Sequence, residues 1–342
     1  MRRLTLFILN LALLLLSGCL DSTGDNQIEE PIPWPNYRFD SGNTGFYPGE
    51  GPSMGQIVDT LVYLEGYIPD WAAPVIDERG NIYISDTYGN VSKFRSDGTL
   101  EWVFATGKAI RGGSGCLIDS VVVFNTEDHS IIGITRSGTL AWSIDIADNS
   151  WIAPVANQAL GFVVTLTKHG YLYAYGSDGN LIYSYYFGEN TISPVHPAID
   201  EEGNCYIAYG KEVYSLSPSG AINWHFTYDT SYATIRTRGL VLTPNDQIVF
   251  AAQGWGDHRL VCIDKNNGDL LWVVIRHNVD YLVSSLAVDP DGNIYVTNYF
   301  GSIDKYNPEG ELIAQFAVSD DVNGRYKLYQ KWSFKNVPLR LE

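Results

Sequence analysis

One short sequence, a glycine turn followed by a leucine or isoleucine and then an aromatic residue, recurs along this chain of 342 residues. The first copy reads Asp97-Gly98-Thr99-Leu100-Glu101-Trp102. Its last position is occupied in turn by Trp102, Trp142, Tyr183, Trp224, Trp272 and Ala314, at intervals of 40, 41, 41, 48 and 42 residues. Four-stranded propeller blades repeat about every 40–45 residues. The period therefore predicts a series of similar four-stranded units.

Residues 73–104 show how one unit divides into strands. Short apolar or alternating stretches at residues 73–77, 82–85, 91–95 and 99–104 are typical of strands. The turns between them contain glycine and asparagine, which adopt left-handed backbone conformations at low cost. A small sheet with two apolar faces needs neighbours that cover both, so we expect the units to pack face to face around a centre.

The same pattern gives six complete repeats, the later five covering residues 117–144, 153–187, 197–226, 240–274 and 286–316. An additional outer strand is predicted at residues 60–66, and two or three short strands can be drawn from the 26 residues after Phe316, which include residues 325–334. The predicted fold is all-β, a β-propeller of four-stranded antiparallel blades. We expect seven blades, with N- and C-terminal strands sharing one blade and closing the ring, because closure removes exposed strand edges. Six and eight blades are the alternatives.

The N-terminus has the pattern of an export signal. Arg2 and Arg3 precede an apolar run at residues 4–16, which is too short to span a bilayer comfortably. The run ends in Leu16-Ser17-Gly18-Cys19, which resembles the lipobox of bacterial lipoproteins. We therefore predict a lipoprotein signal peptide at residues 1–18, lipidation of Cys19, a lipid-anchored flexible linker at residues 19–35 and a single propeller domain at residues 36–342.

Charge and the residue after Cys19 indicate the environment of the protein. Lipoproteins retained in the inner membrane typically carry Asp at that position, whereas this chain has Leu20, which favours an outer membrane if the source has one. The formal net charge is −17, and loss of Arg2 and Arg3 with the signal peptide would make it −19. So acidic a surface repels nucleic acid. We expect a membrane-anchored protein of the cell envelope, on its periplasmic or surface side, with no nucleic-acid partner.

The repeat, with its Gly-x-Leu-x-Trp ending, resembles the tryptophan-docking repeat of pyrroloquinoline-quinone-type propellers. The segment Trp34-Pro35-Asn36-Tyr37-Arg38-Phe39-Asp40-Ser41-Gly42-Asn43-Thr44-Gly45 is similar to the lead-in of many exported members. A more distant resemblance is to the propeller lipoprotein of the outer-membrane β-barrel assembly machine. That likeness implies a lipid anchor and binding to protein partners, without a reaction.

The quinone-dependent dehydrogenases of this superfamily commonly hold their cofactor on a disulfide between adjacent cysteines, beside a calcium ion. Here Cys116, Cys205 and Cys262 lie in different repeats, so we expect buried thiols without a disulfide framework. The oxygen-bearing residues Asp289, Asp291 and Asn293 resemble the start of a calcium loop, but Phe300 stands where the loop needs Glu. We expect no cofactor and no metal, with pyrroloquinoline quinone or calcium as the alternatives. No catalytic residues are assigned.

Loops that enter the first strand of each blade, and loops that join the second and third strands, emerge on one side of a propeller. Here they contain aromatic and basic residues, which supply large contact areas and forked hydrogen bonds. Packing under neighbouring loops and pairing with local carboxylates would explain the same residues. The candidates for a binding face are Trp71, Arg111, Trp151, His196, Tyr232, Arg236, Arg238, Trp255, Arg276, His277 and Tyr281.

These observations favour a non-catalytic binding or scaffold lipoprotein of the bacterial cell envelope. Its loop face, around the central channel, would engage an envelope protein, a peptide or a glycan. The alternative is an enzyme with its site in the central channel, either a quinone-dependent oxidoreductase or a metal-assisted hydrolase or lyase. A deep channel with convergent carboxylates or histidines would favour chemistry, and a broad shallow rim would favour recognition.

Overall fold

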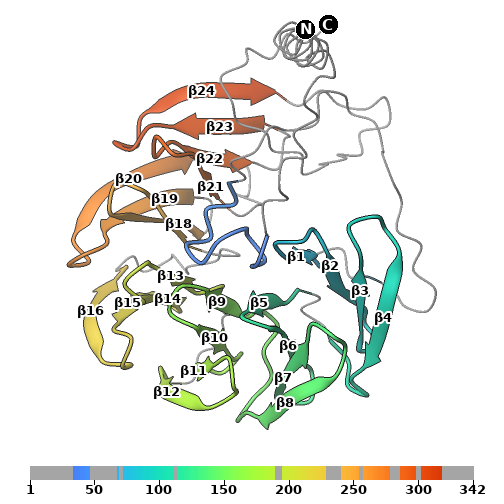
Figure 1. The fold of residues 1–342 in the computed structure, drawn as a ribbon. Helices are drawn as coiled ribbons and strands as arrows, with labels where there is room; N and C mark the ends of the chain where they lie inside the picture. Colours follow the sequence, from blue (N-terminus) through green and yellow to red (C-terminus); the bar gives the residue numbers. More distant parts are fainter. Residues whose placement is uncertain are drawn as a thin grey trace, which may run out of the picture. The chain divides into compact units, whose positions relative to one another are not determined.

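The computed structural model describes residues 34–46, 68, 72–110, 114–188, 195–228, 240–253, 257–277, 286–297 and 302–317. The chain divides into two units, Met1–Pro31 and Ile32–Glu342, and every described residue belongs to the second. All regular secondary structure in these ranges is β-strand (Figure 1). No described segment forms a helix that could cross a lipid bilayer.

The described strands form six antiparallel sheets of four strands, which we call blades 1 to 6, and in each blade neighbouring strands are consecutive in the chain. Blade 1 contains β1 (Val75–Ile76), β2 (Ile82–Ser85), β3 (Asn90–Phe94) and β4 (Leu100–Ala105). Blade 2 contains β5 (Cys116–Ile118), β6 (Val121–Thr126), β7 (Ser130–Thr135) and β8 (Leu140–Asp145). Blade 3 contains β9 (Val155–Asn157), β10 (Phe162–Leu166), β11 (Tyr171–Gly176) and β12 (Leu181–Tyr186). Blade 4 contains β13 (Ala198–Ile199), β14 (Cys205–Tyr209), β15 (Glu212–Leu216) and β16 (Ile222–Thr227). Blade 5 contains β17 (Val241–Leu242), β18 (Gln247–Gln253), β19 (Asp257–Asp264) and β20 (Leu270–His277). Blade 6 contains β21 (Ala287–Val288), β22 (Ile294–Thr297), β23 (Ser302–Tyr306) and β24 (Leu312–Ala317).

The blades confirm the predicted propeller. The first strands of neighbouring blades contact one another in the pairs β1 and β5, β5 and β9, β9 and β13, and β17 and β21. The division of the first repeat is also confirmed, since β2 coincides with the predicted strand at residues 82–85. The described part of the chain accounts for six blades, which is within the predicted range. Residues 60–66 and 325–334, from which a seventh blade was predicted, lie outside the described residues.

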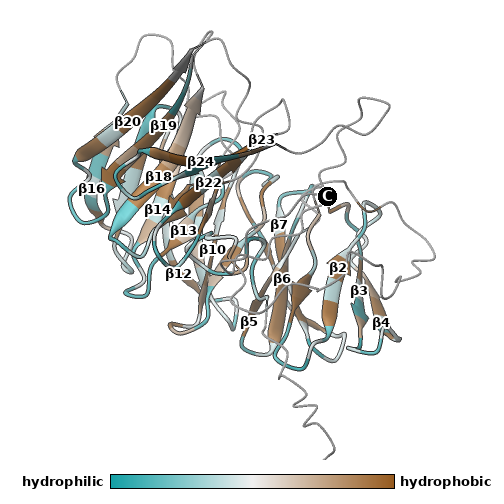
Figure 2. Cartoon of the chain, turned by 90° about the horizontal axis from the view of Figure 1, so that it is seen from above, coloured by the Kyte–Doolittle hydropathy of each residue, from teal (hydrophilic) through white to brown (hydrophobic). Residues whose placement is uncertain are grey.

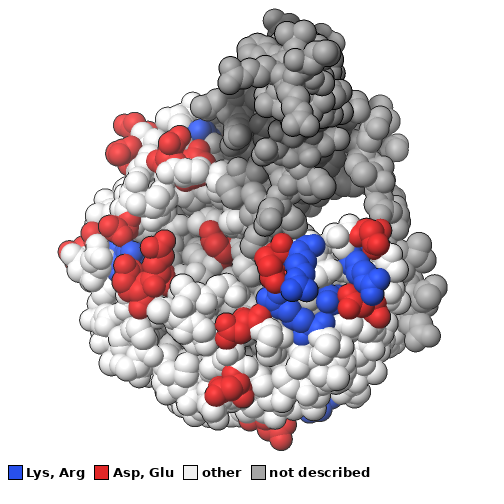
Figure 3. All heavy atoms as spheres, viewed as in Figure 1, with Lys and Arg blue, Asp and Glu red and all other residues white. Residues whose placement is uncertain are grey.

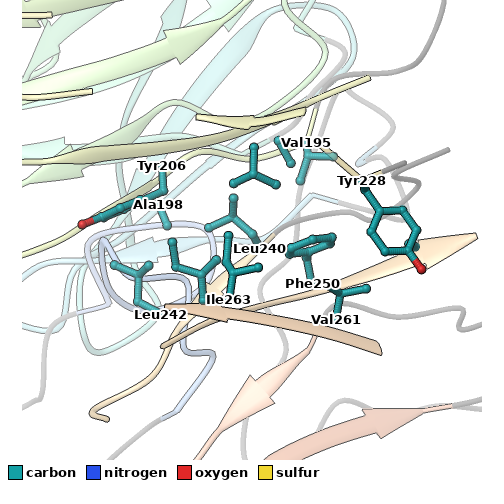
Figure 4. Packing of buried hydrophobic residues seen from close by; sticks show 13 residues of the cluster. Val195, Ala198, Tyr206, Tyr228, Leu240, Leu242, Phe250, Val261 and Ile263 are labelled. Atoms are coloured by element: carbon teal, nitrogen blue, oxygen red, sulfur yellow. The ribbon is translucent and has the colours of Figure 1, made fainter. Parts of the chain in front are cut away.

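Apolar side chains fill the spaces between blades. Figure 4 shows the cluster between blades 4 and 5, which contains Tyr206 and Ala198 of blade 4 and Leu242 and Phe250 of blade 5. Colouring by hydropathy shows the same division over the described chain, with apolar residues along the strands and polar residues concentrated at the turns (Figure 2). Cys116, Cys205 and Cys262 are buried with free thiols, as predicted, and burial raises the pKa of Cys262 to about 12.

The recurring glycine and aromatic residue join each blade to the next. Trp102, in the outer strand of blade 1, lies against Gly138 in the last turn of blade 2, where an added Cβ would be 2.8 Å from the indole ring. Its Nε1–H also donates a 3.0 Å hydrogen bond to the carbonyl of Arg136 in that turn. Trp142, Trp224 and Trp272 repeat the arrangement with the carbonyls of Ser177, Lys265 and Pro308.

Residues 34–46 form a central segment that contacts the first strand of all six blades (Figure 1, blue). It pairs with blade 1 through Trp34 and Ile76, and its backbone carbonyls then accept hydrogen bonds from the later blades. The donors are the backbone N–H groups of Leu117, Ile199, Leu242 and Val288. For blade 3, the buried Asn36 side chain donates to Ala156 O at 3.0 Å and accepts from Ala156 N at 2.8 Å. The first strand of a blade has no strand neighbour on the inner side, and this segment therefore satisfies its free edge.

Candidate functional site

The structure describes only part of the predicted binding face. Seven of its candidates, Trp71, Arg111, Tyr232, Arg236, Arg238, Trp255 and Tyr281, lie outside the described residues. Arg276 and His277 are the last two residues of β20, and only their backbone is described. Trp151 and His196 have described side chains, and both lie in loops that enter the first strand of a blade. The site is therefore built from these two loops.

The loops between blades lie beside the turns that join the second and third strands. The loop before blade 2 meets the turn of that blade through Glu127 N and Ala109 O, 2.8 Å apart. Lys168 N, in the corresponding turn of blade 3, donates to Asn149 O at 2.9 Å. These backbone hydrogen bonds hold both sets of loops on one side of the blades, which we call the loop face.

A buried amide fixes the loop that carries Trp151. Asn125, at the end of β6, donates from Nδ2 to Ile152 O at 2.9 Å and to Thr165 Oγ1 at 2.8 Å. Ser150 Oγ donates to Leu166 O at 2.7 Å. Because these groups are buried, breaking either contact would leave a polar group without a partner. Buried hydrogen bonds therefore anchor the loop at Ser150 and Ile152, on both sides of Trp151.

One charged group lies over the partly exposed indole of Trp151. The Lys168 ammonium lies 4.6 Å from its ring centroid, a cation–π distance. Next to Lys168, the half-exposed His169 ring places Nδ1 2.8 Å from Asp148 Oδ2, which also accepts the His169 backbone N–H. The arrangement presents one aromatic surface, one cation and one histidine–carboxylate pair, all supported by backbone hydrogen bonds. Such a set suits recognition of a mixed polar and aromatic surface.

His196 belongs to the interior rather than to the exposed rim. Its ring is buried and stacks on Tyr37 of the central segment, with centroids 4.7 Å apart. Its Nε2 accepts a 3.2 Å hydrogen bond from Ala153 N in the loop before blade 3. This residue therefore joins the central segment to two blades, which is one of the packing roles that the sequence left open.

The weak calcium candidates form a turn between β21 and β22. The Asp289 carboxylate accepts hydrogen bonds from Asn293 N at 2.8 Å, from Asp291 N at 3.1 Å and from the Tyr295 hydroxyl at 2.9 Å. The Lys305 ammonium lies 3.5 Å from the same carboxylate. Within the described ranges, no three His, Cys, Asp or Glu side chains gather as metal ligands would. The carboxylate is engaged by donors of its own blade.

Charges are unevenly distributed over the described surface. In the view of Figure 3, lysine and arginine side chains gather where blades 1 and 2 lie, while acidic side chains are scattered around the ring. Basic residues of these blades are matched by carboxylates, since Arg136 lies 2.5 Å from Glu78 and Lys93 lies 3.3 Å from Glu101. Hydrogen bonding to Arg136 is the main cause that lowers the pKa of Glu78. At least these two basic side chains of blades 1 and 2 are thus paired with neighbouring carboxylates.

Three residues of the loop face were missed by the sequence analysis. Tyr88, in the turn between β2 and β3, is 70% exposed, the most exposed large hydrophobic side chain among the described residues. Lys168 and His169 occupy the equivalent turn of blade 3. Only their position in the sequence could have identified them, because all three lie between the second and third predicted strands of a repeat. Turns of this kind are predicted to belong to the face, but no local sequence signal distinguishes these three residues within them.

Comparison with known proteins gives one family and several related folds. A family model described as outer membrane protein assembly factor BamB matches residues 127–306, more than half of the chain. Among solved structures, BamB from Moraxella catarrhalis is 16% identical, with 77% of this chain and 90% of that chain covered and a TM-score of 0.48. A europium-containing methanol dehydrogenase is 11% identical, with coverages of 84% and 78% and a TM-score of 0.65, and at this identity the likeness shows the fold alone. A search of curated protein sequences found no match.

Proposed function

Because this chain belongs to the family described as outer membrane protein assembly factor BamB, we propose that it is a non-catalytic binding and scaffold protein of the bacterial cell envelope. The family match carries this proposal, and it agrees with the resemblance found in the repeats. The description of the family concerns assembly, an activity that requires contact with other proteins. The partner of this chain is accordingly an envelope protein or a peptide segment of one.

The loop face supports the proposal with a preorganised aromatic surface. Asn125 anchors the backbone next to Trp151, and the Lys168 ammonium lies over its ring. The Trp151 side chain therefore loses little conformational entropy when a partner covers it. Tyr88 adds a second exposed aromatic ring on the same side of the blades. Aromatic residues of this kind contribute much of the binding energy in protein interfaces.

The predicted lipid anchor completes the proposal. Lipidation of Cys19 would attach the protein to a membrane through the predicted linker at residues 19–35, whose last two residues belong to the central segment. More than one acyl chain is needed for stable attachment, as lipoprotein modification supplies. The protein would then act at the membrane surface, on the outer membrane where the source has one.

A binding experiment on the full-length chain in detergent tests the proposed face. Photo-crosslinking from position 88, at the exposed Tyr88 on the same side of the blades, should first identify a partner in intact cells. We then expect Trp151→Ala to weaken binding of that purified partner by roughly thirtyfold, the effect of losing a hot spot of about 2 kcal/mol. Arg79→Ala provides the control, because Arg79 is an exposed residue of the turn between β1 and β2, away from the loop face. Equal affinity of all three proteins would contradict the proposed face.

A further inference from the structure

The outer strand of blade 5 is apolar on both of its faces. β20 begins Leu270-Leu271-Trp272-Val273-Val274-Ile275, with no charged or strongly polar side chain in six consecutive positions. It lies at the outer edge of its sheet, and β19 is its one strand neighbour within the described ranges (Figure 1). Leu270, Leu271 and Ile275 are 51%, 46% and 46% exposed. A long exposed apolar edge is a ready template for pairing with another strand.

The outer strands of the other described blades are better protected. Polar and charged side chains on an edge strand are the usual protection against pairing with another chain. Positions 271, 273 and 275 of β20 are all apolar, whereas the equivalent positions of every other described blade include a polar residue: Glu101, Ser143, Ser184, Asn223 and Gln315. β19 and β20, with eight residues each, are also the longest described strands. Blade 5 thus combines the longest edge with the least protection.

Packing within the chain accounts for only part of this apolar character. Trp272 and Val274 pack against the cluster between blades 5 and 6, and Val273 packs against the cluster between blades 4 and 5. Because side chains alternate along a strand, Leu271 and Ile275 lie on the same face as Val273. They nevertheless remain nearly half exposed. Leu271 and Ile275 are therefore apolar residues that the neighbouring blades do not fully cover.

We propose that β20 pairs antiparallel with β20 of a second copy of this chain, about a two-fold axis at Val273. This register places Leu271 directly opposite Ile275 of the second copy, and Ile275 opposite its Leu271, so the exposed residues cover one another. On the other face of the joined sheet, Trp272 comes opposite Val274 of the second copy. The two four-stranded blades would then form one continuous sheet, in which neither β20 is an edge.

Charge favours this strand as the place where two copies meet. The formal net charge of −17 makes two copies repel one another over most of their surfaces. Residues 270–275 carry no charge, so that their pairing sets no like charges against each other. At the ends of the same register, Asp269 comes opposite His277 of the second copy rather than opposite another carboxylate. This interface is separate from the loop face and does not rest on the proposed function.

Sedimentation of the full-length chain in density-matched detergent tests the proposal. We expect the wild-type protein to dimerise. Leu271→Lys should weaken the dimer by more than about a hundredfold, because it buries a charge without a partner at two symmetric positions. Ile182→Lys is the matched control, since Ile182 is half exposed at the equivalent position of blade 3, and it should leave the dimer unchanged. A monomeric wild type, or equal dimerisation of Leu271→Lys, overturns the proposal.

Combining Leu271→Lys with Ile275→Glu tests the register. Each change alone should weaken the dimer, whereas together they set opposite charges against each other at both pairs and should restore at least about tenfold of the lost affinity. Failure of this rescue overturns the two-fold axis at Val273.

Salt and the loop-face partner supply two further outcomes. Added sodium chloride should strengthen the wild-type dimer, because it screens the repulsion between two acidic chains, and weakening by salt would contradict an uncharged interface. If the wild type is monomeric and Leu271→Lys loses the partner captured at Tyr88, strand addition by that partner replaces self-pairing.

Discussion

Glycine in the last turn of blades 2 to 6 has two separate reasons for being there. Gly179 has a φ of +83°, a conformation that other residues adopt only with strain. A Cβ at this position would also lie 2.8 Å from the indole of Trp142 in the preceding blade. The same turn supplies Ser177 O, which accepts the Trp142 Nε1–H at 2.9 Å. The recurring motif is therefore a docking site for the aromatic residue of the preceding blade, and both of its ends are needed.

The two effects can be separated by substitution. Gly188 has a φ of +88°, but no atom of the described residues lies within 4 Å of an added Cβ, so Gly188→Ala is chosen to carry the backbone strain alone. We expect it to cost about 1 kcal/mol of unfolding free energy. Gly179→Ala should cost a further 1–3 kcal/mol or so, because the methyl group displaces the indole. Urea unfolding followed by tryptophan fluorescence measures both, and equal losses would show that the docking contact is unimportant.

A second residue-level motif joins the first and second strands of three blades. Asp77 accepts hydrogen bonds from Asn81 N at 2.9 Å and from the Tyr83 hydroxyl at 2.9 Å. Asp200 and Asp289 make the same contacts in blades 4 and 6, with Tyr206 and Tyr295. Burial raises the pKa of Asp77. The hydrogen bonds from Asn81, Tyr83 and Arg79 N together lower this pKa by more than burial raises it, so the net shift is downward.

The lowered pKa of Asp77 predicts an acid-sensitive contribution to stability. The contribution is complete above the unfolded-state pKa of about 3.9 and is lost as the pH falls through the lower pKa of the folded state. Asp77→Asn should therefore destabilise the protein at pH 7 by about 1–3 kcal/mol, and the difference from the wild type should shrink towards pH 3. Unfolding curves between pH 3 and 7 measure this. Asp97→Asn, at an exposed turn, should give a smaller change; a loss independent of pH would refute the role of the charge.

At the scale of elements, the central segment is the feature that unites the blades. It supplies backbone or side-chain partners to the first strand of each described blade, whereas neighbouring blades otherwise meet mainly through side chains. Two residues at the end of the predicted linker, Trp34 and Pro35, take part, through pairing with Ile76 and Leu117. Hydrogen bonding to the blades is thus already present at residues 34 and 35.

Asn36→Ala tests the contribution of this segment. The variant removes both hydrogen bonds to Ala156 and leaves that residue's N–H and C=O without partners in a buried position. We expect a loss of about 2–3 kcal/mol in unfolding free energy and faster proteolysis near residue 36. Asn307→Ala also removes two hydrogen bonds, to Glu311, but at an exposed turn, and should cost less than about 1 kcal/mol. Similar losses would mean that the central segment is only loosely held.

The sequence allowed the blades to be predicted because each strand and turn has a local signal. The alternation of apolar and polar residues, the glycine turn at Gly98 and the aromatic residue after it all lie within a single repeat. The observed strands β2 and β3 agree closely with the strands predicted from these signals. The path of the central segment has no such signal, since Asn36 meets Ala156 across 120 residues of sequence. The burial of His196 depends on Tyr37 from this same segment. Tertiary contacts between distant residues therefore decided the part of the site that could not be predicted.

For the whole molecule, the unequal balance of charge bears on attachment to a membrane. The net charge of −17 gives no electrostatic attraction to anionic lipids. Membrane binding would therefore depend on the acyl chains predicted at Cys19. Attachment through the linker would place the propeller unit near the bilayer without requiring any surface of the blades to be basic.

Cys19→Ser tests this prediction in cells. Loss of the acylated thiol should move the protein from the membrane pellet to the soluble fraction after fractionation, by more than about tenfold, because acyl-chain burial is the main attraction. Cys262→Ser is the matched control, since this thiol is buried within blade 5 and cannot be reached by a lipid-transfer enzyme in the folded protein. Retention of Cys19→Ser in the pellet at the wild-type level would rule out lipidation as the anchor.

The route of the central segment also sets an order of events during biosynthesis. Residues 34–46 leave the ribosome before any strand that binds them, and Asn43 must wait for Leu240, which follows 197 residues later. Closing loops of this length is slow, because chain entropy is lost before the contacts form. Blades can form locally from hairpins while the segment is still free. The first part of the propeller to be synthesised is thus the last to be fixed in place, and a stalled chain would display unoccupied inner strands.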